Sequence, residues 1–232
     1  MFFYDSTFII LIPALIFTMY AQFKVQATFS KYSNIRNNKG LTGADAARMV
    51  LDKNGLSSVP INIINGNALT NYYDPRSKSL NLSSDVARQD SVASISVACH
   101  EVGHAMQDAE HYPMLALRNT MVPVVNLTQT VSIPLIIIGI LLTSVTTFGS
   151  TLFNIGVICF CVVVAFHLVT LPVELNASSR ALKQLDSMGI VDDEDYYGSK
   201  KVLSAAAMTY IAALAMALAN LLRILVLSRG RD

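Results

Sequence analysis

Three long apolar stretches constrain the fold of this chain more than any other feature. They cover approximately Met121–Val145, Leu152–Leu171 and Val202–Leu227, and each is long enough to cross a hydrocarbon core of roughly 30 Å as a helix. Hydrophobic residues make up 53% of the 232 residues and charged residues only 14%, which is well away from the averages of soluble proteins. The sequence therefore predicts an integral membrane protein that is mainly α-helical.

A fourth and shorter apolar run covers residues 8–23. Asp5 precedes this run in place of Lys or Arg, and no small-residue cleavage site follows it, so it differs from a signal peptide. We expect a retained transmembrane anchor, which gives about four transmembrane helices in total. Residues 121–171 are expected to form a membrane hairpin with its connection around Thr146–Thr151, and residues 202–227 the last transmembrane helix.

The distribution of basic residues indicates the orientation of the chain. Fourteen of the seventeen Lys and Arg residues lie within residues 24–118 or 180–201, which predicts that these segments lie in the cytoplasm. Arg229 and Arg231 in the C-terminal tail argue the other way. No run of Lys and Arg with interleaved aromatic residues is present, and the net charge is only +1, so nucleic acid is excluded as a partner.

Residues 24–118 are expected to form a small hydrophilic α+β part. Thr42, with Asp45 in a capping position, begins a short helix that Gly55 ends. Val59–Ile64 and Ser79–Leu82 read as two strands on either side of a turn-rich segment, which predicts an irregular hairpin.

The most specific motif follows this hairpin, on a helix that Ser91 is expected to cap. His100, Glu101 and His104 stand in the order H-E-x-x-H. On a helix, residues four apart share a face, so both imidazoles can bind one zinc ion while Glu101 reaches a water beside it. Two surface histidines are the alternative, but the surrounding run is mostly small and apolar, which disfavours solvated side chains.

A catalytic zinc ion usually takes three protein ligands. The metzincin pattern requires Gly and His where this chain has Gln107 and Glu110, so that pattern is excluded. Glu174 follows Pro172 on a predicted segment of helix and loop, residues 172–201, and it is favoured as the third ligand. His167 lies roughly 10 Å before Glu174 along a helix, so both cannot easily bind one ion; a buried polar role and a secondary role near the site stay open.

Three segments carry a resemblance to a known family: Ala98–Asp108, Leu171–Ser178 and Tyr73–Arg76. They resemble the YugP-like membrane neutral zinc metallopeptidases, and the likeness spans nearly the whole chain. That family is similar in turn to the HtpX-like membrane proteases. The resemblance implies a peptidase with one Zn²⁺ per chain, held by His100, His104 and Glu174. The chain departs from the family pattern at Asn71-Tyr72, where Asp-His is common, and at Ser179, where Arg is common.

These observations predict a zincin-like endopeptidase in the cell membrane, with its site on the cytoplasmic side and a protein or peptide as substrate. Glu101 is the predicted base that accepts a proton from water and returns it to the leaving amine. Tyr73 is a candidate donor to the substrate carbonyl, and Asn176 or Ser178 is expected to orient a zinc-bound histidine. Membrane lipid is an expected partner, and the oligomeric state is left open.

The sequence is compatible with several alternatives. Zinc could instead staple a non-catalytic scaffold or adaptor, whereas a transporter would carry more intramembrane charge than His167 and Arg223 supply. The strand Ile61–Ile64 could add an extended substrate at its edge or be purely structural. Cys99 is expected to pack in the core, and the acidic residues 192–195 to form a solvated loop before the last helix.

Overall fold

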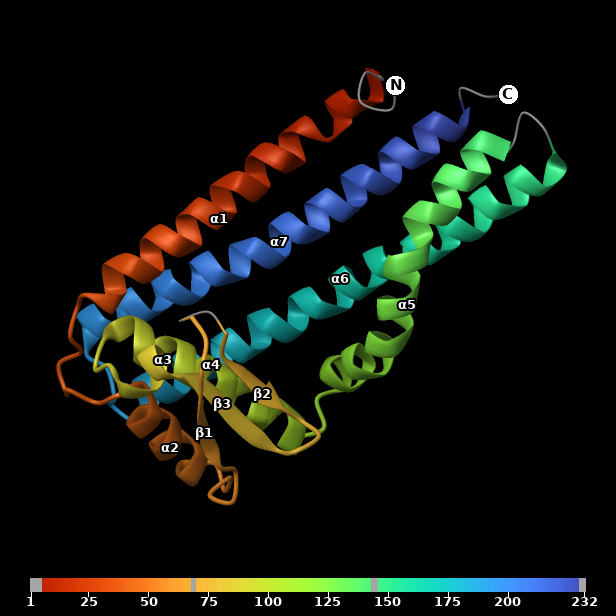
Figure 1. The fold of residues 1–232 in the computed structure, drawn as a ribbon. Helices are drawn as coiled ribbons and strands as arrows, with labels where there is room; N and C mark the ends of the chain where they lie inside the picture. The colour runs from red at the N-terminus through yellow and green to blue at the C-terminus, as the bar shows by residue number, and fades with distance from the viewer. Residues whose placement is uncertain (1–5, 68–69, 143–145, 230–232) are drawn as a thin grey trace. The chain divides into compact units, whose positions relative to one another are not determined.

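The computed structural model describes residues 6–67, 70–142 and 146–229. The chain is mainly helical and contains one small sheet (Figure 1). It divides into two compact units, which we call the apolar unit and the sheet unit. The apolar unit comprises Met1–Tyr20, Ala116–Leu171 and Tyr210–Asp232, and the sheet unit comprises Ala21–Leu115 and Pro172–Thr209. The long helices contribute residues to both units.

Three of the described helices are long and apolar enough to cross a membrane, as the sequence predicts. They are α5 (Pro113–Leu142), α6 (Thr147–Ser187) and α7 (Asp193–Arg229). The predicted anchor at residues 8–23 corresponds to a 3₁₀ helix, η1 (Ser6–Ile10), and the first half of α1 (Ile12–Ser33). Because α1 is not among the three helices, a fourth crossing stays a prediction.

The helix boundaries differ from those expected. Helix α6 continues without a break through Pro172. Proline removes one donor and clashes with the carbonyl four residues before it, but membrane helices tolerate it where neighbouring groups satisfy the freed backbone. The predicted segment of helix and loop, residues 172–201, comprises the end of α6, the non-helical residues 188–192 and the start of α7. Residues 147–151, expected in a connection, are helical, and residues 143–145 lie outside the described residues.

Acidic residues begin α7, where they suit the positive end of the helix dipole. Asp195 nevertheless is not part of a solvated loop. It is buried, and its Oδ2 accepts the main-chain N–H of Asn38 at 2.8 Å. The expectation of a purely solvated acidic segment is therefore wrong at this residue.

The sheet has three strands, β1 (Ile61–Ile64), β2 (Tyr72–Asp74) and β3 (Ser79–Ser83), in the order β1-β3-β2. Strands β1 and β3 are parallel, so the predicted hairpin between them is wrong. The hairpin joins β2 and β3 instead. The carboxylate of Asp74 stabilises this turn by accepting the N–H of Arg76 and the hydroxyl of Ser77.

Three shorter helices lie wholly within the sheet unit: α2 (Gly43–Lys53), α3 (Ser84–Arg88) and α4 (Val92–Ala109). Thr42 caps α2 through a capping box with Asp45, and Ser91 caps α4, so both predicted helix starts are confirmed. Helix α2 packs on α4, and strands and helices share one apolar core. Its fully buried members include Val50, Leu51, Leu80, Leu82, Ile95, Val102 and Leu185.

Candidate metal centre

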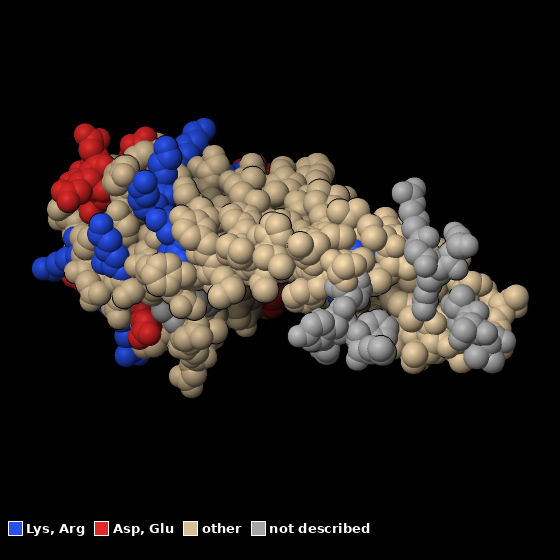
Figure 2. Space-filling model, turned by 90° about the horizontal axis from the view of Figure 1, so that it is seen from above, with Lys and Arg blue, Asp and Glu red and all other residues tan. Residues whose placement is uncertain are grey.

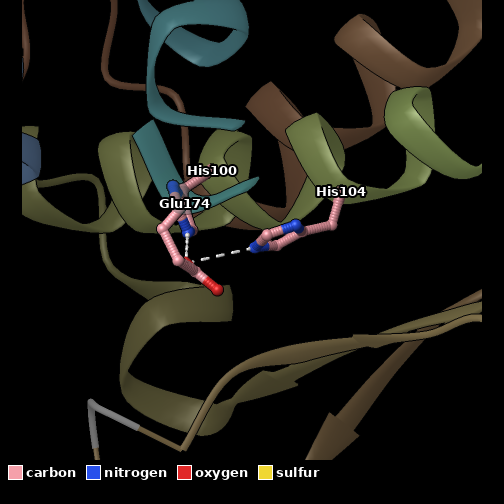
Figure 3. A group of neighbouring side chains, drawn as sticks. All are labelled: His100, His104 and Glu174. Carbon is pink, nitrogen blue, oxygen red and sulfur yellow. Dashed lines mark hydrogen bonds and ion pairs between the residues drawn. The ribbon is translucent and has the colours of Figure 1, made fainter. Parts of the chain in front are cut away.

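Three potential metal ligands meet within the sheet unit. His100 and His104 lie one turn apart on α4, and Glu174 lies on α6. Oε2 of Glu174 is 3.3 Å from Nε2 of His100 and 3.5 Å from Nε2 of His104 (Figure 3). Each of the three residues offers one ligand atom, and these atoms all lie within 4.8 Å of one another. The structure thus brings together the three predicted ligands.

Two of the three spacings among these atoms suit a tetrahedral zinc ion. Bonds of roughly 2.0–2.1 Å and tetrahedral angles place neighbouring ligand atoms about 3.3–3.4 Å apart. The two nitrogen–oxygen distances to Glu174 agree with this value. Two imidazoles and one carboxylate form a donor set of catalytic zinc sites and leave a fourth position for water or substrate. The residues present therefore fit zinc.

A close approach of two helices positions Glu174. Gly103 lies between the two histidines on α4, and a Cβ atom there would lie 2.5 Å from the carbonyl oxygen of Ala177. Only glycine allows the backbones of α4 and α6 to come this close. Since Ala177 and Glu174 are three residues apart on one face of α6, the same contact turns the carboxylate towards the histidines.

Glu101 is buried beside the ligands. Its Oε2 accepts the main-chain N–H of Tyr73 at 3.2 Å. Burial raises the pKa of Glu101, and the opposing effect of the neighbouring His100 and His104 does not cancel this shift. A raised pKa makes a carboxylate a stronger proton acceptor.

Tyr73 lies at the site as predicted, but its main-chain N–H contacts the site and its hydroxyl does not. Its main-chain N–H faces Glu101, while its hydroxyl donates to Oδ2 of Asp108 at 2.8 Å. Burial and the hydrogen bond with Asp108 raise the pKa of the Tyr73 hydroxyl. Because the proton of this hydroxyl is already donated, its predicted role towards a substrate carbonyl stays a prediction.

Each imidazole has a hydrogen-bond partner on the nitrogen that faces away from Glu174. Nδ1 of His100 lies 3.1 Å from the hydroxyl of Ser178, as one of the sequence-based alternatives expects. Nδ1 of His104 lies 3.0 Å from Oε1 of Gln107. Such partners hold a zinc-binding imidazole in one tautomer and orientation.

Gln107 is the site residue that the sequence reading missed. It is fully buried, and its Nε2 donates to the carbonyl oxygen of Val173 at 2.8 Å and to Oδ1 of Asn176 at 2.9 Å. Asn176 therefore acts on His104 through Gln107. Gln107 lies three residues after His104 on the same helix face. This spacing is the sequence signal that could have identified Gln107 as a partner of His104.

The hydrogen-bonded chain continues to the surface. Arg180 donates from Nε to Oδ1 of Asn176 and from Nη1 to Oε1 of Glu110, both at 2.7 Å. The hydrogen bond from Arg180 lowers the pKa of Glu110. The end of α4 is thereby joined to α6 by a continuous set of polar contacts that begins at His104.

Two other residues considered from the sequence lie outside the ligand set. His167 belongs to the apolar unit and is not a member of the metal-binding group found among the described residues. Cys99 is fully buried in the core of the sheet unit. Burial raises the pKa of its thiol to about 12, which keeps it protonated, in agreement with the expected packing role.

Comparisons with known proteins agree with this chemistry. A sequence model of the family described as "Putative neutral zinc metallopeptidase" matches residues 7–229. The chain is 45% identical over 222 residues to the Bacillus subtilis protein described as "Putative membrane protease YugP". The aligned region covers 95% of this chain and 96% of that protein. No solved structure matches.

Proposed function

Since the chain belongs to this neutral zinc metallopeptidase family, we propose that it is a membrane endopeptidase that holds one zinc ion at His100, His104 and Glu174. The observation that carries the proposal is the position of Glu101. A buried carboxyl group with a raised pKa lies directly beside a three-ligand set that leaves a fourth position open.

Each residue of the site has a distinct part in peptide hydrolysis. A bound zinc ion supplies a Lewis acid that makes water more acidic and polarises a carbonyl. Glu101 accepts the proton of the attacking water and returns it to the nitrogen of the leaving amine. Ser178 and Gln107 hold the two imidazoles in position, so the ligands do not reorganise during the reaction.

Strand β2 is the better candidate for holding the substrate backbone than β1. Both are edge strands, but β2 contacts α4, and the N–H of Tyr73 on its outer edge points to Glu101. An extended peptide that pairs with this edge would place its carbonyl groups beside the base. Recognition through the backbone suits a protease with little sequence preference.

Cleavage is proposed next to the cytoplasmic face of the membrane. Glu174 follows Leu171, the end of a predicted apolar stretch, by only three positions in one continuous helix. Most Lys and Arg residues lie in the segments that carry the site, which favours the cytoplasmic side. Membrane proteins and unfolded soluble proteins are both compatible substrates, and the surrounding lipid is a partner of the apolar unit.

A non-catalytic scaffold stapled by zinc is the competing function. The polar contacts that join α4 to α6 through Gln107, Asn176 and Arg180 would serve that function equally well. A structural zinc site, however, has four protein ligands. The set here has three and leaves a fourth position open, and a structural site would not need the buried carboxyl group of Glu101 beside it.

The experiment that separates the two functions compares wild type with Glu101→Gln. Both proteins, purified in detergent, are expected to hold about one zinc ion per chain. Hydrolysis of casein is expected to fall by at least about a hundredfold in the variant, because the general base is lost while the ligands stay. Glu194→Gln, at an exposed position on α7, is the matched control and should keep both properties.

Two results would contradict the proposal. Unchanged hydrolysis by Glu101→Gln would remove Glu101 as the base. Zinc in all three proteins, with no hydrolysis of casein or of membrane proteins by the wild type, would favour the scaffold.

A further inference from the structure

A groove of about 500 Å³ lies between α1 and α7 in the sheet unit. None of the metal ligands, nor Glu101, contributes to its lining. One stripe of α1 forms one wall, where Lys24, Thr28 and Lys31 recur at helical spacing. The other wall is a stripe of α7 that includes Lys201 and Ser204.

The charges of the groove are all positive. Three lysines, Lys24, Lys31 and Lys201, line it, and no Asp or Glu does. Within the described parts of the chain, the ion pairs found involve none of these three lysines. Three ammonium groups that line one groove without a carboxylate among its lining residues favour an anionic ligand.

Aromatic rings lie beside two of these ammonium groups. Nζ of Lys31 is 5.3 Å from the ring centre of Tyr32, and Nζ of Lys201 is 4.9 Å from that of Tyr197. Both tyrosines also line the groove. The rings limit the directions in which the lysine side chains extend, and the hydroxyl of Ser204 adds a neutral donor for an anion.

The rest of the lining is apolar. Phe23, Ala27, Ala205 and Met208 contribute to the walls, and Phe23 is 71% exposed. Inorganic phosphate or a sugar phosphate would leave these apolar surfaces in water. A ligand with a negative head and an apolar tail would cover them.

The position of the groove in the sequence agrees with such a ligand. The apolar run at residues 8–23 ends at its wall on α1, and the stretch 202–227 of the membrane-length helix α7 begins at its other wall. Both walls therefore lie where apolar segments pass into the segments rich in Lys and Arg. Figure 2 shows that Lys and Arg side chains, together with Asp and Glu side chains, gather on one part of the surface, while most of the remaining described surface in that view is uncharged.

We propose that this groove binds one anionic phospholipid of the cytoplasmic leaflet. Its phosphate is held by Lys24, Lys31 and Lys201, and its acyl chains lie against the apolar residues of α1 and α7. Clusters of basic residues at a helix end on the cytoplasmic side attract anionic headgroups. This site is separate from the zinc chemistry and does not depend on it.

Native mass spectrometry of the full chain in detergent tests the proposal. The protein is titrated with dioctanoylphosphatidylglycerol, with dioctanoylphosphatidylcholine and with inorganic phosphate. One phosphatidylglycerol per chain is expected to bind, at least about tenfold more tightly than either of the other two. Equal affinity for phosphatidylcholine would overturn the proposal, and so would equal affinity for inorganic phosphate.

Matched variants separate a built site from general attraction to positive charge. The triple variant Lys24→Gln, Lys31→Gln, Lys201→Gln is expected to weaken phosphatidylglycerol binding by at least about tenfold. The triple variant Lys39→Gln, Lys53→Gln, Lys200→Gln removes the same charge from lysines that do not line the groove and should change the affinity less than threefold. Equal weakening by both triple variants would contradict the proposal.

A third variant tests the groove without changing charge. Ala27→Phe fills the space between the walls and is expected to weaken phosphatidylglycerol binding as well; unchanged affinity would place the lipid elsewhere. A thermal midpoint at the wild-type level verifies that each variant is folded. Should the first triple variant misfold, the adjacent single variants Lys201→Gln and Lys200→Gln repeat the comparison, with weakening expected only from Lys201→Gln.

Discussion

The sheet unit and the apolar unit differ in how far their large hydrophobic side chains are buried. The sheet unit buries Leu51, Leu80 and Leu82 completely. The apolar unit leaves Leu127 64% exposed and Ile158 65% exposed, and only 17–22% of the most apolar windows of α5, α6 and α7 is buried. One hydrophobic effect accounts for both patterns if water surrounds the first unit and lipid the second.

The hydrogen-bond partners of polar side chains also differ between the two units. In the apolar unit, Thr128 and Thr130 donate to carbonyl oxygens of their own helix, which satisfies these two hydroxyls without water. In the sheet unit, buried Gln107 bonds to another helix, and Tyr73 on β2 bonds to α4. The metal centre is therefore a property of the tertiary structure of the sheet unit.

Removal of the α6 ligand should have the largest effect. Glu174→Gln is expected to weaken zinc binding by more than about a hundredfold, since loss of a direct ligand exceeds the 10- to 100-fold cost of losing an outer partner. Zinc retained after dialysis against a chelator measures this. His167→Gln, on the same helix but in the apolar unit, should retain zinc; loss of zinc there would contradict the ligand assignment.

An arginine placed on the exposed surface of each unit tests whether that surface faces water or lipid. Leu127→Arg, near the middle of α5, should cost roughly 2.5–3.5 kcal/mol if that surface faces lipid. Met49→Arg, at a position on α2 that is 40% exposed, should cost less than about 0.5 kcal/mol. The apparent free energy of membrane insertion for α5 and the thermal midpoint of the purified proteins measure the two effects. Similar tolerance of both substitutions would remove the contrast between the units.

A methyl group at a helix contact tests whether the units are energetically separate. Gly103→Ala forces a Cβ against the backbone of Ala177 and should cost about 1–3 kcal/mol, with lower zinc content because Glu174 moves away. Gly156→Ala in the apolar unit meets Ile136 and the carbonyl oxygen of Ser132. It should lower the thermal midpoint and leave zinc content unchanged; zinc loss in both variants would show that the units are coupled.

Loss of the amide that holds His104 should have the smallest of these effects on metal binding. Gln107→Leu removes the partner of Nδ1 and is expected to weaken zinc binding by about 10- to 100-fold, as measured by competition with a fluorescent chelator. Gln129→Leu, at an exposed position on α5 in the apolar unit, makes the same chemical change. It should leave the affinity as it is, and an equal loss would mean that the effect of Gln107→Leu is not local.

Much of the fold follows from local sequence signals. The caps at Thr42 and Ser91 and the three apolar helices depend on neighbouring residues and on composition, which a single sequence displays. Strand pairing is different. The parallel partner of β1 and the short strand β2 follow from contacts across the sheet, and no local pattern distinguishes them from a simple hairpin.

The metal centre likewise depends partly on local sequence signals and partly on contacts between distant segments. By itself the sequence determined the helical pair His100 and His104 with Glu101 beside them, because a spacing of four sets a helix face. The tertiary structure decided that Glu174, 74 positions after His100, lies 3.3 Å from it, and that Gln107 holds His104. Both depend on how closely α4 and α6 approach at Gly103, which is set by packing between distant segments and not by local periodicity.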